Sequence, residues 1–449
     1  MEPFQYHVLV CTQEKPEGVK SCSASCSGQV LSVLHRELEV LGVAGNVQVT
    51  TCGCLGLCDE GPMLIVYPDG VWYRGVKVPD VPDIVSSHLR SGKPVARLIW
   101  NDAPAMKAMI TEHGNQYRAV LKAREQAGVL PDDINELIRG FMPSRTVLTA
   151  LELDVFTAVA GGASADVVAD RVQASPRGTE MLLHALAALK LLRKENGLFK
   201  NTPLSARFFM EDSPDSARKA LLHTANLWHR WENLTGSVCA GTPAPKPGDR
   251  EWVTTFIAAM DRNARERAQA VVTAVGAESI RRILDLGGGS AAYSIAFAQA
   301  NSVLTAEVLD LAEVIPLTQE YVRGSGLADR IHTRAGDMLC DPLGDGFDLI
   351  LLSAICHMFS AEENRALFQR AFAALDPGGR LLIQDFILEP EKTAPRFAAL
   401  FALNMLVSTR EGSTYSEPEY ASWLTAAGFT EVRRVRLPGP AGMLIARRN

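Results

Sequence analysis

Cysteines near the start of the chain are the first residues whose type and spacing could do chemistry. Six of the nine cysteines fall within the first 58 residues. Cys11 and Cys22 are separated by ten residues and Cys54 and Cys58 by three, with the second pair inside the glycine-rich segment GCLGLCDEGP. Four thiolates from two loops can enclose a two-iron, two-sulfur cluster, and glycines let backbone amides approach the sulfurs. The spacing therefore predicts an iron–sulfur site, with a zinc site or unliganded cysteines as the alternatives.

Two neighbouring cysteines leave the choice of ligands open. Cys26 could take the place of Cys22, and Cys52 with Cys54 could bind zinc. The Ser-Cys pair ahead of the helical pattern favours Cys22, because residues 5–90 resemble the thioredoxin-like 2Fe-2S ferredoxins in this feature. The resemblance implies a 2Fe-2S cluster with four ligands: Cys11, Cys22, Cys54 and Cys58.

A second chemical feature is the glycine-rich segment DLGGGS, residues 285–290, between the strand-like RRIL and the helical pattern AAYSIAFAQA. Its glycines permit a tight turn and let a nucleotide-like cofactor lie against the backbone at a helix N-terminus. The G-x-G-x-x-A spacing, with Asp310 about 20 residues further on, also fits the dinucleotide fingerprint. Asp285, two residues before the first glycine, favours S-adenosylmethionine, because an acid there resembles the methyltransferase E/D-x-G-x-G motif.

The segment AGDMLCDPL and the closing strand pair EVRRVRL and GMLIARR are also typical of methyltransferases. Residues 130–449 resemble the O-methyltransferases of the caffeic-acid and acetylserotonin type. The resemblance implies S-adenosylmethionine as the methyl donor, with Gly287 at its amino-acid end and Asp310 at its ribose hydroxyls. Asp337 and Met338 would contact the adenine. The full donor-binding set that we expect is Asp285, Gly287, Gly289, Asp310, Leu311, Asp337, Met338 and Ser353.

A candidate general base follows the strand-like segment FDLILLSAI, on the ligand side of such a sheet. It is His357, whose imidazole can take a hydroxyl proton near neutral pH. The resemblance implies that His357 is the catalytic base and that Asp385, at the end of the next strand, orients it. Ser353 and Met358 depart from the family pattern, which has a basic residue and an Asp at these positions. The alternative is a strand-end histidine bonded to the backbone.

Four residues are candidates for contact with the methyl acceptor. Phe256 and Met260 stand four apart in the helical pattern WVTTFIAAMDRNARERAQ and resemble the family's substrate-clamping pair. Asn404 and Met405, in FAALFALNMLV, could line the same pocket. Residues with this spacing also occur in any packed helix, so a role in the core is the alternative for each of them.

Alternating strand-like and helical segments must position these residues. HVLVCT, VQVTTC and two strands around a Pro-Asp-Gly turn, with the helix SGQVLSVLHRELEVLG, predict a small α/β unit. Helical segments over 144–159, 164–172 and 179–194, followed by ENGLFKNTP, resemble a winged helix. Five later strand-like segments predict a doubly wound parallel sheet, and the short PGPA connection makes the last two strands antiparallel.

The predicted fold class is α/β, in five segments. They are 1–95, a thioredoxin-like ferredoxin domain; 96–130, a helical linker; 131–210, a winged-helix dimerisation domain; 211–275, connecting helices that line the substrate site; and 276–449, a Rossmann-like methyltransferase domain with a final antiparallel strand.

The composition excludes several classes of function. With 47% hydrophobic and 21% charged residues, the 449-residue chain is an ordinary multidomain globular protein. The formal net charge of -6 does not indicate a nucleic-acid-binding surface. The sequence has no stretch of about 18 apolar residues, the length that a membrane helix needs. The start MEPFQYHVLV has no basic region before an apolar stretch, so we expect a cytoplasmic protein with reduced cysteines.

Together these patterns and the family resemblance imply an enzyme that methylates a hydroxyl of a small aromatic or polyketide-like molecule. It would be a homodimer through the winged-helix segment, and its 2Fe-2S cluster would have a redox or regulatory role, with an electron-transfer partner. One alternative is a redox-coupled enzyme, or a carbon or sulfur methyltransferase, to which the cluster supplies electrons. Another is a non-enzymatic redox sensor that binds DNA, which the acidic charge balance disfavours.

Overall fold

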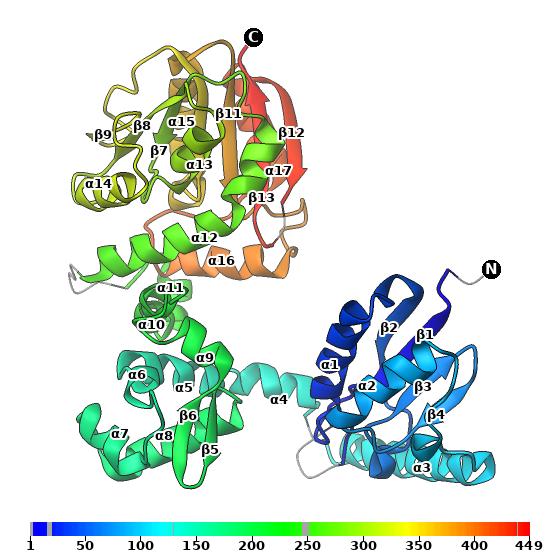
Figure 1. Ribbon diagram of the computed structural model, residues 1–449. Coiled ribbons are helices and arrows are strands. Elements are labelled where there is room, and N and C mark those ends of the chain that lie inside the picture. The colour runs from blue at the N-terminus through cyan, green and yellow to red at the C-terminus, as the bar shows by residue number, and fades with distance from the viewer. Residues whose placement is uncertain (1–2, 16–19, 129, 245–250, 438) are drawn as a thin grey trace. The chain divides into compact units, whose positions relative to one another are not determined.

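Two units make up the protein, Met1–Gly140 and Phe141–Asn449 (Figure 1). The computed structural model describes residues 3–15, 20–128, 130–244, 251–437 and 439–449. None of the helices within these ranges is long and apolar enough to cross a membrane.

A four-stranded mixed sheet forms the centre of the first unit, in the order β2-β1-β3-β4. The strands are β1 (Tyr6–Cys11), β2 (Val47–Cys52), β3 (Leu64–Tyr67) and β4 (Val71–Tyr73). The parallel strands β1 and β2 are connected through α1 (Ser27–Val40), and β3 pairs antiparallel with both β1 and β4. Val30, Leu34 and Leu38 of α1 are buried in one apolar cluster with Val8 and Val10 of β1. The predicted strands and helix are confirmed.

The other elements of the first unit are helical. They are α2 (Val81–Asp83), a π-helical turn (Ile84–Leu89), α3 (Ala103–Gln126), α4 (Asp132–Arg139), and turns of 3-10 helix at Ala44–Asn46, Cys58–Glu60, Val78–Asp80 and Ala96–Leu98. Asp102 caps α3 by accepting a hydrogen bond from the backbone N–H of Ala105 at 2.9 Å. The segment expected as a helical arm is therefore largely one helix. Met106, Met109 and Ile110 of that helix pack in the apolar cluster around Cys11 and Cys22.

Short helices and a β-hairpin open the second unit. They are α5 (Phe141–Glu152), α6 (Val155–Ala158), α7 (Ala165–Arg171), α8 (Pro176–Ala188), β5 (Leu192–Glu195), β6 (Leu198–Asn201) and α9 (Pro203–Phe208). The predicted helix over 179–194 was wrong at its end, because α8 stops at Ala188 and the following residues form β5. Lys190 takes a left-handed backbone conformation, φ 60°, which ends the helix, and Leu192 then becomes buried in the hairpin.

Three helices lead from this part to a seven-stranded sheet. They are α10 (Arg218–Trp231), α11 (Leu234–Ala240) and α12 (Glu251–Val275). The sheet has the order β12-β13-β11-β10-β7-β8-β9. Its strands are β7 (Arg282–Leu286), β8 (Thr305–Asp310), β9 (Ile331–Ala335), β10 (Phe347–Ser353), β11 (Leu375–Asp385), β12 (Thr430–Arg436) and β13 (Gly442–Arg447).

The connections of this sheet create one ligand-binding edge. Strands β7, β8, β9, β10 and β11 run parallel to one another. The last strand, β13, is antiparallel to both β11 and β12, as predicted. The chain runs outward from β7 through β8 to β9, and then returns to β10 on the other side of β7. In such a sheet, ligands bind outside the carboxyl ends of the strands at this reversal of direction. The carboxyl ends of β7, β8, β10 and β11 are therefore the place to look for the site.

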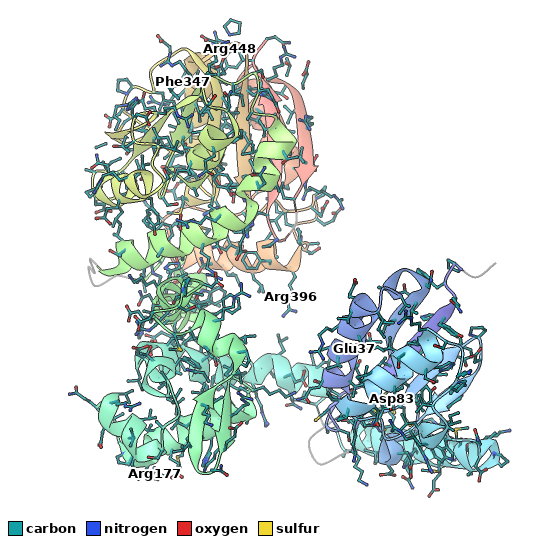
Figure 2. The ribbon with its side chains drawn as sticks, viewed as in Figure 1. Glu37, Asp83, Arg177, Phe347, Arg396 and Arg448 are labelled. Atoms are coloured by element: carbon teal, nitrogen blue, oxygen red, sulfur yellow. The ribbon has the colours of Figure 1, made fainter. Side chains whose placement is uncertain are left out.

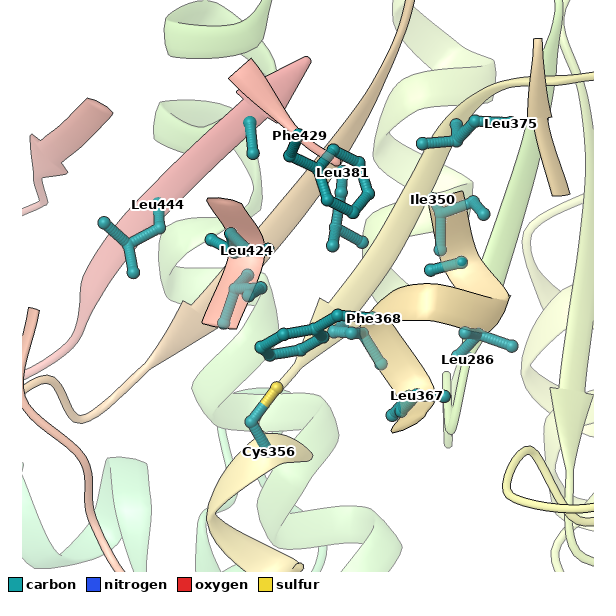
Figure 3. Close-up of a cluster of buried hydrophobic side chains, with 14 of the residues drawn as sticks. Leu286, Ile350, Cys356, Leu367, Phe368, Leu375, Leu381, Leu424, Phe429 and Leu444 are labelled. Atoms are coloured by element: carbon teal, nitrogen blue, oxygen red, sulfur yellow. The ribbon is translucent and has the colours of Figure 1, made fainter. Parts of the chain in front are cut away.

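Helices cover both faces of the sheet and bury its alternating side chains. The remaining helices are α13 (Ala292–Ala300), α14 (Ile315–Gly324), a 3-10 turn (Cys356–Met358), α15 (Ala361–Ala374), α16 (Arg396–Leu406) and α17 (Glu417–Ala426). On one face, Ile350, Leu381 and Leu444 pack with Phe368 of α15 and Leu424 of α17 (Figure 3). Side chains one position along these strands pack instead with α12, α13 and α14. This alternation decides which helices each strand-end side chain faces.

The end of the sheet opposite the candidate edge is closed by backbone contacts. Phe347 begins β10 and is buried there, and Arg448 follows β13 at the same end (Figure 2). The backbone N–H of Arg448 donates to the carbonyl of Gly379 at 2.9 Å, and its side chain donates to the carbonyls of Phe372 and Ala373 at 2.8 and 3.0 Å. These contacts tie the last strand to the end of α15.

Candidate functional site

The turn after β7 has a shape that only glycine allows. Gly287 and Gly289 have positive φ angles of +66° and +55°. A Cβ on Gly287 would lie 2.4 Å from Ile355 Cδ1 and 3.1 Å from Met338 Cε. The structure therefore brings Gly287 together with Met338, two residues that we expected to touch the donor. An L-residue at Gly287 would be strained by its backbone and would also clash.

Asp310, at the carboxyl end of β8, fixes the glycine turn from the neighbouring strand. Its Oδ2 accepts a hydrogen bond from the N–H of Gly289 at 2.8 Å, and its Oδ1 accepts one from the N–H of Leu311 at 2.7 Å. Burial raises the pKa of Asp310, and these two N–H groups oppose that shift. Leu311 is 50% exposed beside it. A carboxylate has lone pairs for more than two donors, so Asp310 keeps acceptor capacity for ribose hydroxyls.

Asp285 is almost completely buried and only partly satisfied. Its Oδ2 accepts the hydroxyl of Ser294 at 2.7 Å. Its Oδ1 has no hydrogen-bond partner among the residues that the structure describes. Burial, with a smaller contribution from the charge of Asp310, raises the pKa of Asp285 to about 6. An unsatisfied buried carboxylate oxygen beside a glycine turn fits a site that a polar ligand completes.

Asp337 lies at an exposed turn after β9. Its Oδ1 accepts from the N–H of Leu339 at 2.9 Å, and its own N–H donates to Oδ2 of Asp341 at 2.8 Å. These contacts are those of an ordinary turn residue, and the assignment of Asp337 to the adenine stays a prediction. Met338, the next residue, is buried against the glycine turn.

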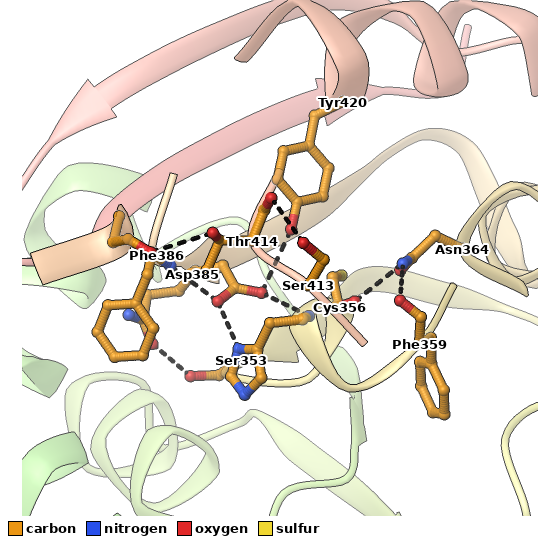
Figure 4. A network of polar contacts seen from close by, with 12 residues as sticks. Ser353, Cys356, Phe359, Asn364, Asp385, Phe386, Ser413, Thr414 and Tyr420 are labelled. Atoms are coloured by element: carbon orange, nitrogen blue, oxygen red, sulfur yellow. Dashed lines mark hydrogen bonds and ion pairs between the residues drawn. The ribbon is translucent and has the colours of Figure 1, made fainter. Parts of the chain in front are cut away.

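His357 and Asp385 form a buried pair at the ends of β10 and β11. The Nδ1 of His357 lies 2.6 Å from Oδ1 of Asp385, and the N–H of His357 donates to Oδ2 at 3.1 Å (Figure 4). The hydroxyl of Tyr420 donates to Oδ2 at 3.3 Å, and the N–H of Phe386 donates to Oδ1 at 2.7 Å. With Nδ1–H directed at Asp385, Nε2 is the nitrogen that is left to accept a proton.

Aromatic rings surround the imidazole. The ring centroids of Phe386 and Phe401 lie 5.9 and 4.9 Å from that of His357. Phe397 packs on both of these rings and is 47% exposed. Sequence reasoning missed Tyr420, Phe386 and both α16 rings. The four-residue spacing of Phe397 and Phe401 was a signal for one helical face, whereas nothing in the sequence connected Tyr420 to Asp385.

The predicted acceptor-contacting residues are divided between α12 and α16. Phe256 stacks edge-on to His223 with centroids 5.3 Å apart, and Met260 lies half-buried one turn further along α12. Asn404 accepts a hydrogen bond from the indole N–H of Trp231 at 2.9 Å, and Met405 is buried. Asn404 is one turn beyond Phe401, so α16 carries both the ring against His357 and a polar group.

In the first unit the cysteines stand in two pairs. Cys11 and Cys22 are buried side by side in one apolar cluster, and the Sγ atoms of Cys54 and Cys58 are 3.4 Å apart. The contact with Cys22 lowers the pKa of Cys11 to about 6. Gly61 packs directly on this site, since a Cβ there would lie 2.7 Å from Cys22 Sγ. Within the described ranges, no three His, Cys, Asp or Glu side chains stand together as ligands for a single metal ion.

The two neighbouring cysteines lie outside these pairs. Cys26 is exposed at the N-terminus of α1, with a left-handed φ of 70°. Cys52 is half-buried on β2, directly opposite Cys11 in the strand register. Cys11 and Cys22 also share an apolar cluster with Leu57, Met63 and Trp100, from which Cys26 is absent. The geometry favours Cys22 over Cys26.

The strand order, the glycine turn after β7 and the acid at the end of β8 define a Rossmann-like methyltransferase that uses S-adenosylmethionine. Two family models make this assignment more specific. The O-methyltransferase domain matches residues 243–430, and the O-methyltransferase dimerisation domain matches residues 135–211. The chain belongs to this O-methyltransferase family. These two matches leave residues 1–134, 212–242 and 431–449 outside them.

Similar proteins agree with this assignment. The chain is 33% identical over 321 residues to the 3-hydroxy-5-methyl-1-naphthoate 3-O-methyltransferase of Streptomyces sahachiroi, covering 69% of this chain and 92% of that one. It is 31% identical to the tetracenomycin polyketide synthesis 8-O-methyl transferase TcmO of Streptomyces glaucescens, covering 71% and 97%. Among solved structures, human N-acetylserotonin methyltransferase in complex with SAM is 26% identical with a TM-score of 0.64, covering 70% and 96%.

Proposed function

We propose that this enzyme transfers the methyl group of S-adenosylmethionine to a hydroxyl of a small aromatic, polyketide-like molecule. The observation that carries the proposal is the buried His357–Asp385 pair at the carboxyl edge of the sheet. The naphthoate and tetracenomycin methyltransferases named above support the substrate class. The aromatic rings of Phe386, Phe397 and Phe401 beside the imidazole suit a flat acceptor.

The residues at the carboxyl edge of the sheet would bind different parts of the donor. Gly287 and Gly289 let it approach the backbone, Asp310 would hold its ribose, and Met338 would pack on its adenine with Leu311 and Asp337. Asp285 fits S-adenosylmethionine as a ligand because its Oδ1 is a buried acceptor without a partner among the described residues. When bound, S-adenosylmethionine supplies an activated methyl group on sulfur.

His357 acts on the acceptor. Asp385 holds Nδ1–H, so that Nε2 faces the acceptor hydroxyl as a base. As the hydroxyl proton moves to Nε2, the positive imidazolium is stabilised by the Asp385 carboxylate 2.6 Å away. Phe256, Met260, Asn404 and Met405 would line the acceptor pocket with the three phenylalanines.

The experiment for this function is a methyl-transfer assay with matched aromatic acceptors. A hydroxynaphthoate, its amino analogue, its thiol analogue and the unsubstituted naphthoate are incubated with the full chain and S-adenosylmethionine. The proposal expects an O-methyl product from the hydroxyl compound alone. An N-, S- or C-methyl product in place of the ether would overturn the assignment to hydroxyl acceptors.

We also propose that the enzyme is a homodimer through its winged-helix segment. Within the range matched by the dimerisation domain, Phe141, Met142, Met181 and Leu204 are more than half exposed. Exposed apolar side chains of this kind are typical of subunit interfaces. Light scattering coupled to gel filtration tests this. A dimer mass is expected, and a monomer mass at micromolar concentration would contradict it.

We propose further that residues 1–95 form a thioredoxin-like ferredoxin domain whose Cys11, Cys22, Cys54 and Cys58 hold a 2Fe-2S cluster. Such a cluster takes four thiolates, two for each iron, and two pairs are what the first unit offers. The N–H of Gly56 donates to Cys54 Sγ at 3.3 Å, and the ammonium of Lys15 reaches Cys54 and Cys58. N–H and cationic partners of this kind suit anionic sulfur.

A bound cluster would carry one electron at a time. It would give this first unit a redox or regulatory role, in a cytoplasmic protein with an electron-transfer partner. Iron and sulfide analysis of protein purified without oxygen, with electron paramagnetic resonance after reduction, tests the cluster. Two irons and two sulfides per chain with a reduced-state signal are expected. Stoichiometric zinc and no iron would contradict it.

A further inference from the structure

A small polar network lies behind the glycine turn, on the face of the sheet covered by α12 and α13. Ser353 is the last residue of β10 and pairs in register with Gln384 of β11. The hydroxyl of Ser353 donates to Gln384 Oε1 at 2.7 Å (Figure 4), and the hydroxyl of Tyr293, in the first turn of α13, donates to the same oxygen at 3.0 Å. Both hydroxyl hydrogen bonds end on Oε1, at one end of the amide, and Nε2 is at the other end.

The other end of this amide is unpaired among the described residues. Gln384 is 2% exposed, and its Nε2 is buried without a hydrogen-bond partner among the described residues. A buried N–H donor that stays unpaired costs stability, so native proteins nearly always satisfy it. The donor therefore points to a ligand with an acceptor atom.

The position of this donor indicates which ligand. Alternation along β11 puts Gln384 on the opposite face from Asp385, and therefore away from the base and on the same face as Asp285. Asp285 Oδ1, on β7, is a buried acceptor that also has no partner among the described residues. β10 lies between β7 and β11, and Tyr293 links the two groups, because its hydroxyl donates to Gln384 and its pKa responds to the charge of Asp285. A buried N–H donor and a buried carboxylate oxygen on this one face complement an α-amino acid, with its carboxylate and its ammonium group.

Charge in the vicinity supports the same ligand. Ser353 occupies a position where the sequence resemblance leads one to expect a basic residue, so the strand itself supplies no cation. Arg267 of α12 lies close enough for its charge to act on Tyr293. Burial raises the pKa of Tyr293, and the hydrogen bond with Ser353 and the charge of Arg267 oppose this shift. A positive guanidinium near a neutral amide donor suits a carboxylate.

We propose that Gln384 is a donor-binding residue whose Nε2 hydrogen-bonds the α-carboxylate of S-adenosylmethionine, with Arg267 balancing its charge and Asp285 facing its ammonium group. The inference rests on the proposed binding of this donor. Ser353 and Tyr293 are positioning residues, because they orient the amide and need not touch the ligand.

Two ligands that differ only at the amino-acid end provide the test. S-adenosylhomocysteine has the carboxylate, whereas 5′-methylthioadenosine has the same nucleoside and sulfur without it. Calorimetry with Gln384→Met is expected to show about 10- to 100-fold weaker binding of S-adenosylhomocysteine, as for a lost hydrogen bond to a charged group. Binding of methylthioadenosine should change by less than about twofold. Gln384→Glu should weaken S-adenosylhomocysteine further, because it sets two carboxylates against each other.

Gln369→Met, an exposed position on α15, is the matched control and should leave both affinities unchanged. Equal weakening of both ligands by Gln384→Met would mean a structural role and overturn the proposal. An unchanged affinity for S-adenosylhomocysteine, or a rise only in the acceptor KM, would also overturn it. If Gln384→Met does not fold, the isosteric Gln384→Glu decides alone. Wild-type protein that binds neither ligand would instead contradict the proposed function itself.

Discussion

The cysteine loops of the first unit and the strand-end site of the second gather their chemical groups in different ways. Cys11 ends β1, Cys22 precedes α1, and Cys54 and Cys58 follow β2, so the proposed cluster would need only four sulfur atoms and nearby N–H donors from these short segments. The strand-end site draws Asp285, Asp310, His357, Asp385 and Tyr420 from five different elements. Cysteine spacing alone suggests the proposed cluster, whereas the residues of the strand-end site come together only because the sheet aligns the elements that carry them.

The largest contrast between the two sites is expected from removing a thiolate. Cys58→Ala should abolish the iron content and the reduced-state resonance signal, because a 2Fe-2S cluster needs all four ligands. Calorimetry should show that the Cys58→Ala variant binds S-adenosylhomocysteine with unchanged affinity. Cys26→Ala, at the exposed residue outside the two pairs, should keep the full iron content. Loss of iron in Cys26→Ala with retention in a Cys22→Ala variant would reverse the ligand assignment.

Gly287→Ala should have the next largest effect, and at the second site alone. The left-handed backbone costs a residue with a Cβ about 1–2 kcal/mol, and the contact with Ile355 at 2.4 Å adds to it. We expect a loss of this size in the free energy of unfolding, with donor affinity at least about tenfold weaker. Urea denaturation and calorimetry measure both.

Gly236→Ala is the control for that substitution, since this helical glycine has open space around its Cβ position. It should be neutral or raise stability by about 0.5–1 kcal/mol. A Gly287→Ala protein with normal stability and donor affinity would show that the turn does not need glycine.

Asp285 should make stability depend on pH. Its pKa of about 6 lies above the ordinary aspartate value of 3.8, so the folded protein favours the neutral carboxyl group. This contribution is fully present below about pH 4 and is lost as the pH rises through about 6, by about 3 kcal/mol in all. Asp285→Asn should remove that fall, as urea denaturation at a series of pH values would show. Parallel pH curves for the two proteins would contradict the assignment.

Tyr420→Phe should have the smallest effect. It removes one hydrogen bond to Asp385, at 3.3 Å, and leaves the His357 contact in place. A loss of about 0.5–1.5 kcal/mol corresponds to a kcat lowered by about 2- to 10-fold. Tyr415→Phe is the control, because its hydroxyl donates to the Phe359 carbonyl in the same aromatic cluster. Equal losses of kcat in both variants would mean that Tyr420 acts only through packing.

Much of the fold could be predicted from the sequence because each strand of the large sheet carries its own apolar pattern. The glycine turn and its acids could be predicted for the same local reason. The end of α8 could not, since Leu192 continues a helical pattern, while the left-handed turn at Lys190 and the pairing with β6 place it in a strand. Tyr420 and Gln384 could not be assigned either. Their roles depend on partners from 31 to 91 residues away, which no local pattern reveals.

The measurement that most directly tests the central claim is the rate of methyl transfer by His357→Ala to a hydroxynaphthoate that the wild-type enzyme methylates. The account predicts a kcat about 100- to 10,000-fold below that of the wild type, with the affinity for S-adenosylhomocysteine unchanged. An unchanged kcat in a variant that still binds S-adenosylhomocysteine would contradict the role of His357 as the base.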